Sequence, residues 1–367
     1  MAGQLVFHQT TLFVLMLFWG ASLAFAQDDC VPFNPEDTKI VDRGPVKTVL
    51  GPLSSFNPCH SSVRLDTPSF FAKKRGEKPP LVIIAHGGGG LGGYERDFAR
   101  LLSQQGYATL IFDAFQMNGL TPFSDLLLYQ MSNGGRQRMI YKATLGAYQW
   151  ALKSTKVDTT KIFFQGLSNG AAVSINMAAA VDPAHVRGVI AEGGPSTGIG
   201  FPDEIKVPLL LLYGGADNYG GSHKEDWMHL RAMPCGYNDF YPVAPVGFAQ
   251  NCNRTVNQSN PMPSPQGWFE SVKAKGFDIR LELMDGGGHG MMFSDFSSTA
   301  KPLPGGRIYH ISIGATADTR SKAQRLVLEF LESKLLNSAL LLETAFPTLK
   351  RLLLSNTQPL GGQGQTS

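Results

Sequence analysis

Charged residues are scarce in this chain of 367 residues: Asp, Glu, Lys and Arg together make up only 17% of it. Hydrophobic residues make up 43%, so the chain has enough apolar surface to fold and is not an intrinsically disordered protein. The formal net charge is only +3, with both signs mixed, so the strong basic surface that binds nucleic acid is also missing. A collagen-like or multi-span membrane composition is absent as well. These absences leave a globular protein of one large or two ordinary domains.

Charge is missing altogether from residues 1–26, which contain no Asp, Glu, Lys or Arg. An apolar run over residues 12–25 leads into an A-x-A pattern at residues 24–26. This pattern predicts a secretory signal peptide, residues 1–26. Only His8 stands where basic residues are usual, so an uncleaved membrane anchor is the alternative, although the run is shorter than the roughly 20 residues of a spanning helix. We expect a secreted or periplasmic protein that leaves the membrane after cleavage.

Cysteine is rare, and none of the four cysteines forms a CxxC pair, which argues against a zinc knuckle. All four lie beyond the leader, at Cys30, Cys59, Cys235 and Cys252. An even number of cysteines in an exported chain predicts two disulfides. Three pairings are open. We favour Cys30–Cys59 and Cys235–Cys252, because each pair flanks one loop-like segment.

The body of the chain alternates short apolar runs with segments of helical periodicity. Strands are predicted at residues 46–50, 63–65, 81–85, 108–112, 161–164, 186–191, 207–212 and 277–284, and helices at residues 94–105, 137–153, 171–180 and 317–336. Apolar strands that alternate with helices predict the α/β class, with a mostly parallel sheet covered by helices on both faces. We expect one domain over residues 27–336, with an insertion or cap at 218–265, and a C-terminal helix and disordered tail over 337–367.

Residues 166–170 have the pattern G-x-S-x-G and lie between a predicted strand and a predicted helix. This is the context of a nucleophile elbow, a tight turn that exposes the serine at the carboxyl edge of a parallel sheet. Small flanking residues are needed because the turn is tight. We therefore interpret Ser168 as a nucleophile. The alternative is an ordinary turn in which Ser168 caps the following helix.

A catalytic serine needs a base and an acid. His289 lies in the glycine-rich stretch 286–290 after the last predicted strand, and the chain order serine, acid, histidine is typical of serine hydrolases of this kind. Asp217 follows the strand before it and is the expected acid, which would orient His289 and stabilise its charged form. Glu192, at the end of the strand 186–191, is a second candidate, and Asp226 is a weaker third.

Residues 86–90 read HGGGG at the end of an early strand. An HGGG-type motif offers a backbone N–H to the developing oxyanion, beside the N–H of the residue after the nucleophile, here Asn169. Glycine suits this task because it lets the backbone approach the substrate oxygen closely. We expect Gly88 to be the donor, with Gly87 or Gly89 as alternatives.

The same stretch has a rival interpretation as a dinucleotide-binding loop. Gly87, Gly89 and Gly92 form G-x-G-x-x-G after a strand, and Asp113 follows at the end of the next strand, where a ribose-binding acid is expected. That would make the protein an oxidoreductase. It is the weaker interpretation, because the chain is expected to be exported and the serine, acid and histidine would have no role. No HExxH, P-loop or EF-hand pattern is present, so we expect no metal.

These motifs together resemble the dienelactone hydrolase branch of the α/β-hydrolase superfamily over about residues 80–335. The resemblance rests on residues 86–90, 166–170, 214–217 and 288–293, and on the end of the closing helix at 329–331. It implies an eight-stranded, mostly parallel sheet, a Ser or Cys nucleophile, no cofactor, and hydrolysis of esters or lactones. The name-giving enzymes use cysteine where this chain has Ser168, and its leader, insertion and tail also differ. These departures favour a general carboxylesterase, an acetyl esterase or a polyester-type hydrolase.

The sequence therefore predicts a serine hydrolase that cleaves a small-molecule or polymeric carboxylic ester through an acyl-enzyme. Amide cleavage on the same fold, the oxidoreductase and a non-catalytic binding protein are the alternatives. The insertion at 218–265 directly follows Asp217, so we expect it to overhang the site and shape the substrate pocket. No nucleic-acid partner is expected, and the sequence does not fix the oligomeric state.

Overall fold

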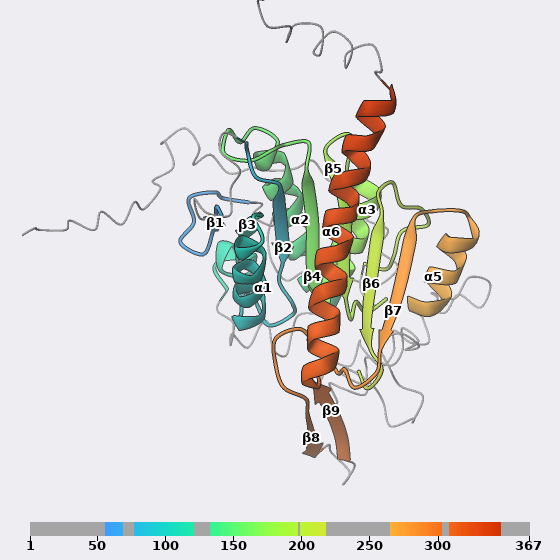
Figure 1. Ribbon diagram of the computed structural model, residues 1–367. Helices are drawn as coiled ribbons and strands as arrows, with labels where there is room; N and C mark the ends of the chain where they lie inside the picture. Colours follow the sequence, from blue (N-terminus) through green and yellow to red (C-terminus); the bar gives the residue numbers. More distant parts are fainter. Residues whose placement is uncertain are drawn as a thin grey trace, which may run out of the picture.

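A computed structural model describes residues 56–68, 77–120, 133–196, 199–217, 265–302 and 308–345 of the chain. These residues form a central β-sheet with helices on both faces and a two-stranded hairpin at one end (Figure 1). The α/β class and the mostly parallel sheet predicted from the alternation of strands and helices are thereby confirmed.

The central sheet has seven strands in the order β1-β3-β2-β4-β5-β6-β7. They are Arg64–Asp66 (β1), Leu81–Ala85 (β2), Ala108–Ile111 (β3), Ile162–Leu167 (β4), Val186–Glu192 (β5), Leu209–Gly214 (β6) and Ile279–Met284 (β7). Strand β1 is antiparallel to β3, whereas β2 to β7 are parallel. Seven of the eight predicted strands therefore lie in this sheet. The eighth, at residues 46–50, is outside the described residues.

The order of the strands reverses at β2, which has β3 on one side and β4 on the other. The register pairs Ile84 with Gln165 and Ala85 with Gly166, so β2 and β4 end side by side. In open α/β sheets, binding and catalytic residues lie at the carboxyl ends of strands beside such a reversal. The glycine-rich loop after β2 and the G-x-S-x-G turn after β4 consequently leave the sheet as neighbours.

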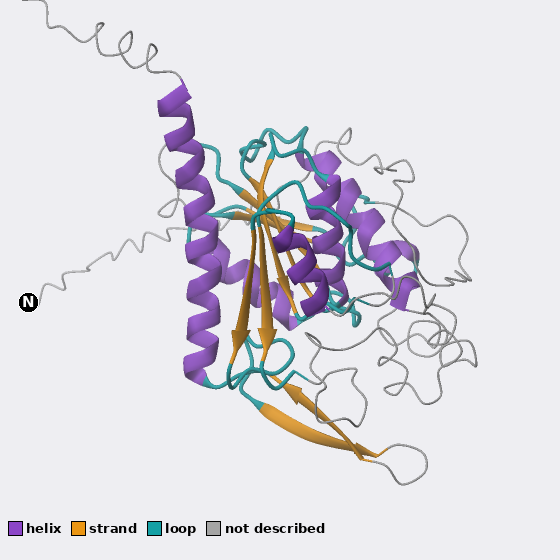
Figure 2. Cartoon of the chain, turned by 90° about the vertical axis from the view of Figure 1, so that its right-hand side faces the viewer, coloured by secondary structure: helices purple, strands orange, loops and turns teal. Residues whose placement is uncertain are grey.

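Two layers of helices cover the sheet. Helices α1 (Gly93–Gln104) and α6 (Ala317–Ala345) pack on one face, and α2 (Asn133–Ala151), α3 (Asn169–Ala180) and α5 (Pro265–Ala274) pack on the other (Figures 1 and 2). Along β2, Leu81 and Ile83 face the α2 and α3 side, whereas Val82 and Ile84 face the α1 and α6 side. All five residues of β2 are buried, which explains why a strand covered on both faces is an uninterrupted apolar run.

Four elements differ from the sequence-based expectations. Helix α5 was not predicted, and neither was the hairpin of β8 (Ser297–Pro302) and β9 (Ile308–Ile313). Helix α6 continues to Ala345, past residue 336 where the predicted helix ended. Residues 317–345 contain no glycine or proline, so nothing in the backbone interrupts the helix at residue 336.

Several predictions fall on residues that the structure does not describe. These are the signal peptide at 1–26, residues 218–264 of the insertion, and the tail beyond 345. Cys59 is disulfide-bonded, but the other three cysteines lie outside the described residues, so the pairing stays a prediction. Among the helices that are described, none is both long enough and apolar enough to cross a membrane.

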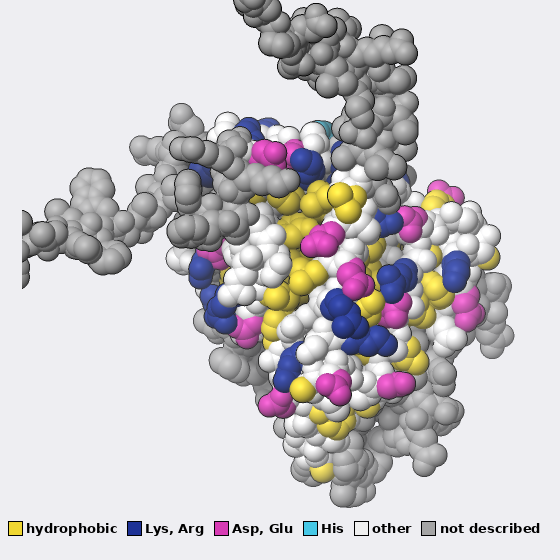
Figure 3. Space-filling view, in the orientation of Figure 1, with side chains coloured by type: hydrophobic (Ala, Val, Ile, Leu, Met, Phe, Trp, Pro, Cys, Tyr) yellow, Lys and Arg dark blue, Asp and Glu magenta, His cyan; other side chains and the backbone are white. Residues whose placement is uncertain are grey.

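The surface over α1 and α6 carries charges of both signs. Basic and acidic side chains are interspersed there, with apolar side chains between them (Figure 3). This mixing of acidic and basic side chains agrees with the low formal net charge of the whole chain.

Candidate active site

Ser168 occupies the turn between β4 and α3, with φ 57° and ψ −120°. In the described part of the chain, it is the one residue other than glycine with a positive φ. Such a backbone conformation costs about 1–3 kcal/mol and persists only where the surrounding structure imposes it. Strain of this kind concentrates at active sites and ligand-binding turns.

The two glycines of the G-x-S-x-G turn impose this conformation by close packing. A Cβ atom on Gly166 would lie 2.1 Å from the carbonyl oxygen of Gly170. A Cβ atom on Gly170 would lie 2.1 Å from the carbonyl oxygen of Ala85, at the end of β2. Both distances are shorter than any real contact, so the turn requires glycine at both positions. The turn is thus packed directly against the strand that carries the glycine-rich loop.

Hydrogen bonding argues against the interpretation of Ser168 as an ordinary helix cap. Ser168 holds the N-cap position of α3, yet its side chain makes no capping hydrogen bond. Its carbonyl oxygen accepts the N–H groups of Ala171 and Ala172, as any N-cap residue does. The hydroxyl is not used to cap the helix and lies at a site that is 8% exposed.

His289 and Asp217 come from neighbouring strands and are hydrogen-bonded. Asp217 follows β6, His289 follows β7, and their Nδ1 and Oδ2 atoms are 2.8 Å apart. Gly193, after β5, lies beneath this pair with φ 59°, and a Cβ atom there would come within 3.1 Å of both atoms. Of the three acids that the sequence offered, the structure thus pairs Asp217 with His289. Glu192 bonds elsewhere, and Asp226 is outside the described residues.

The His289 loop lies beside the serine turn. Gly290 follows His289, and a Cβ atom on it would be 3.6 Å from the side chain of Leu167, the residue before Ser168. The three residues predicted as nucleophile, acid and base therefore gather at one edge of the sheet, from the ends of β4, β6 and β7.

The environment of His289 raises its pKa above the ordinary 6.5. Burial is the largest influence and would lower this pKa. The charge and hydrogen bond of Asp217, with a further contribution from the charge of Glu192, outweigh burial because they favour the imidazolium. A histidine held in this way is a stronger base than a free imidazole.

The glycine-rich loop places Gly88 next to Asn169. A Cβ atom on Gly88 would lie 2.8 Å from Asn169 Nδ2. The N–H of Gly87 already donates to the buried carboxylate of Glu95 at 3.1 Å, which removes Gly87 as an alternative donor to an oxyanion. The Asn169 side chain is fixed in turn by Gln137 of α2, whose Nε2 donates to Oδ1 at 3.0 Å. Sequence patterns gave no sign of Glu95 or Gln137, because both act through tertiary contacts.

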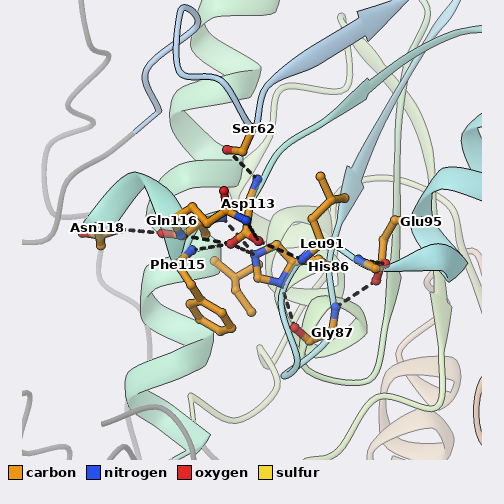
Figure 4. A network of polar contacts seen from close by, with 12 residues as sticks. Ser62, His86, Gly87, Leu91, Glu95, Asp113, Phe115, Gln116 and Asn118 are labelled. Atoms are coloured by element: carbon orange, nitrogen blue, oxygen red, sulfur yellow. Dashed lines mark hydrogen bonds and ion pairs between the residues drawn. The ribbon is translucent and has the colours of Figure 1, made fainter. Parts of the chain in front are cut away.

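His86 is a structural link in this loop (Figure 4). The backbone N–H of Ala114 donates to His86 Nε2 at 3.0 Å, so this nitrogen carries no hydrogen. Nδ1 therefore carries the hydrogen and donates to the carbonyl oxygen of Gly87 at 2.7 Å. The ring is buried and neutral, and its 3.9 Å approach to Asp113 is not an ion pair, because Nε2 and the carboxylate are both acceptors. His86 ties the end of β2 to the segment after β3.

Asp113, the ribose-binding acid of the rival interpretation, is fully buried. One carboxylate oxygen accepts the N–H groups of Phe115 and Gln116, and the other accepts the N–H of Leu91 and the side chain of Gln116 (Figure 4). A ribose would have to reach an accessible carboxylate, and Asp113 offers none. The dinucleotide-binding alternative is therefore wrong: these residues fold the glycine-rich loop instead of binding a cofactor.

The chain is similar to a known protein family over part of its length. Residues 68–238 match the family model of the Dienelactone hydrolase family. The match includes the glycine-rich loop, the Ser168 turn and Asp217, whereas His289 lies beyond it. The chain thus has an α/β fold with a mostly parallel sheet and is similar to this hydrolase family over residues 68–238.

Several solved structures are similar to the chain. One is a dienelactone hydrolase from Anabaena variabilis, at 17% identity and a TM-score of 0.42, covering 74% of this chain and 90% of that one. Another is Thermogutta terrifontis esterase 2, at 13% identity and a TM-score of 0.39, covering 77% and 89%. A third is the Pyrococcus horikoshii acylaminoacyl peptidase, at 17% identity and a TM-score of 0.46, covering 74% of this chain and 39% of the peptidase. No curated protein sequence matches the chain.

Proposed function

We propose that this protein is a serine hydrolase that cleaves carboxylic esters, with Ser168 as its nucleophile. The observation that carries the proposal is the strained backbone of Ser168, held by Gly166 and Gly170, with a hydroxyl that does not cap its helix. In a turn with only a structural role, this strain would have no compensating benefit. In a nucleophile elbow, the strained conformation exposes the serine oxygen at the edge of the sheet, next to a base.

In the proposed reaction, Ser168 Oγ attacks the ester carbonyl while His289 takes its proton. His289 then gives that proton to the leaving alcohol, and water hydrolyses the acyl-enzyme by the reverse sequence. Asp217 keeps the hydrogen of His289 on Nδ1, so that Nε2 is the atom that accepts the proton. The backbone N–H groups of Gly88 and Asn169 would bind the oxyanion, and losing one such donor typically costs about 2.7–4 kcal/mol of barrier.

An ester substrate is supported by the match to the dienelactone hydrolase family. Because Ser168 stands where the name-giving enzymes use cysteine, we propose a general carboxylic ester, small or polymeric, instead of a dienelactone. Export through the leader at residues 1–26 is also part of the proposal and would bring the enzyme to substrates outside the cell.

The test is labelling of the purified mature protein with a fluorophosphonate probe, followed by peptide mapping. An activated serine reacts with the phosphonate, so we expect one labelled peptide containing Ser168 and hydrolysis of a short-chain chromogenic ester. Ser168→Ala should abolish both.

A matched control is Ser174→Ala, because Ser174 lies in the same helix and is fully buried. Labelling and turnover should survive this change. Folded wild-type protein that is not labelled at Ser168, or a Ser168→Ala variant that keeps wild-type turnover, would contradict the proposal.

A further inference from the structure

Glu192, the last residue of β5, is a buried carboxyl group that the proposed reaction leaves unused. It is 1% exposed and lies at the same edge of the sheet as Ser168, Asp217 and His289. Burying a carboxylate is costly unless hydrogen bonds compensate it. The partners of Glu192 therefore indicate what it does.

Both carboxyl oxygens of Glu192 bind elements that carry the site. Oε1 accepts the N–H of Met291, two residues after His289, at 2.6 Å. Oε2 accepts the hydroxyl of Tyr94 in the first turn of α1, just after the glycine-rich loop. The backbone oxygen of Glu192 accepts the N–H of Ser168 at 2.9 Å. One residue thus connects the His289 loop, the serine turn and α1.

Glu192 acts on His289 in a different way from Asp217. Asp217 makes the direct hydrogen bond to the imidazole, whereas Glu192 holds the loop that carries it. Burial raises the pKa of Glu192 to about 7, with the charge of Asp217 acting in the same direction. The hydrogen bonds of Tyr94 and Met291 and the charge of His289 oppose this rise. The groups that face Glu192 are therefore Tyr94 from α1, Asp217 after β6, and His289 with Met291 after β7.

We propose that Glu192 is a positioning residue for the hydrolytic site. It fixes the His289 loop by accepting the Met291 N–H, and when ionised it favours the protonated imidazole through its negative charge. This inference rests on the proposed function, because it assigns Glu192 to the base of that reaction.

Two substitutions at Glu192 separate its two effects. Glu192→Ala removes the acceptor for the Met291 N–H, so the His289 loop is released and kcat should fall about 10–100-fold while KM stays within about two-fold. Glu192→Gln keeps an acceptor oxygen and should restore most of kcat. It removes the negative charge, so the acid limb of the kcat/KM profile should move to lower pH.

Glu204→Gln is the matched control, because Glu204 is exposed and the same change there should leave the kinetics and pH profile as in the wild type. Wild-type activity in Glu192→Ala would overturn the proposal. So would an equal loss in both Glu192 variants with an unmoved acid limb.

A second measurement does not depend on turnover. NMR titration of the histidine rings in the full chain, with His289 assigned from a His289→Gln variant, follows the imidazole directly. Glu192→Gln should lower the apparent pKa of His289, and an unchanged value would overturn the electrostatic part of the proposal. If Glu192→Ala does not fold, Glu192→Gln and this titration decide the matter.

The outcomes also separate the two proposals. A wild-type protein that is neither labelled at Ser168 nor active on esters contradicts the proposed function, and the titration still tests Glu192. An active wild type whose Glu192 variants behave like it contradicts only the positioning role.

Discussion

The buried pair of His289 and Asp217 determines how the site should respond to pH. The pKa of His289 lies above its ordinary 6.5, because Asp217 and Glu192 together outweigh the opposing effect of burial. In the proposed reaction His289 is the general base, which must be neutral to accept a proton, so we expect activity to fall as pH drops below this raised pKa. The acid limb of the wild-type kcat/KM profile should accordingly lie above pH 6.5.

Asp217→Asn tests this dependence at the residue that contributes most to it. The amide carries no charge and does not hold the hydrogen of the imidazole on Nδ1, so we expect kcat to fall about 10³–10⁴-fold. The acid limb of the remaining activity should move to lower pH. Hydrolysis of a chromogenic ester between pH 5 and 9 measures both. Asp285→Asn is the control, because that side chain is exposed. Loss of less than ten-fold with an unmoved limb would exclude Asp217 as the partner of the base.

The sequence was sufficient to predict which strand ends carry Ser168, Asp217 and His289, but not how the loop around them is fixed. Ser168, Asp217 and His289 each follow a strand, and their order along the chain was enough to bring them to one edge. The structural roles of Glu95 and Asp113 could not be predicted from the order of motifs along the chain. Each carboxylate accepts backbone N–H groups of the glycine-rich loop, and those bonds exist only once α1 and β3 are packed.

At the scale of elements, the loop that carries His289 is joined to the end of the β8–β9 hairpin. The N–H of His289 donates to the carbonyl oxygen of Ser312 at 2.9 Å, and the N–H of Gly314 donates back to His289 at 2.9 Å. The N–H of Gly288 donates to Gly314 at 2.7 Å. The hairpin therefore continues into a short ladder that holds the base from the side opposite to β6.

Gly314→Ala should weaken this ladder. Gly314 has φ 70°, and a Cβ atom there would lie 2.2 Å from the carbonyl oxygen of Asp295, so the backbone must shift. Gly276→Ala is a matched control, because Gly276 has φ 85° and no atom within 4 Å of an added Cβ. The control should lose about 1–2 kcal/mol of stability from strain alone and keep its activity.

We expect Gly314→Ala to lose about 2 kcal/mol or more beyond the control and to lower kcat/KM. Urea unfolding and ester kinetics on both variants measure this. Equal stability and activity in the two variants would mean that the ladder does not support the base.

Burial explains which elements the sequence could predict. Strands β2 and β6 are buried along their whole length, so their apolar runs are unmistakable. The hairpin strands lie outside the two cores, and β8 has few apolar residues to reveal a pattern, with residues 297–300 all exposed. Helix α5 begins at Pro265, in a proline-rich stretch that is typical of a loop, and only Trp268 and Val272 of its non-proline residues are buried. Their burial depends on packing against the sheet.

For the whole molecule, buried groups with raised pKa values make stability depend on pH. Glu192 has an ordinary value of 4.5 and a pKa of about 7 in the folded protein, so folding favours its protonated form. This contribution to stability is fully present below pH 4.5 and is lost as pH rises through about 7. The raised pKa of His289 acts in the same direction, because folding also favours its protonated form.

Glu192→Gln should remove the pH dependence of stability that Glu192 contributes. A difference of about 2.5 pKa units corresponds to about 3 kcal/mol, so the free energy of unfolding of the wild type should fall relative to the variant by about that amount between pH 5 and 8. Urea unfolding at several pH values measures it, with Glu204→Gln as the exposed control. A difference between wild type and Glu192→Gln that stays constant with pH would contradict the assignment of a raised pKa to Glu192.

The reversal of strand order at β2 determines how late the site assembles during folding. Leu81 pairs with Ile162 although the whole of α1, β3 and α2 lies between them in the chain, and the site is completed only when β7 joins β6. Such non-local pairings form late, because each must first close a long loop. During synthesis, the segment bearing Ser168 leaves the ribosome well before the one bearing His289. Under the proposed function, the nascent chain therefore carries a serine that is not yet activated, and we expect reactivity toward esters only from the assembled protein.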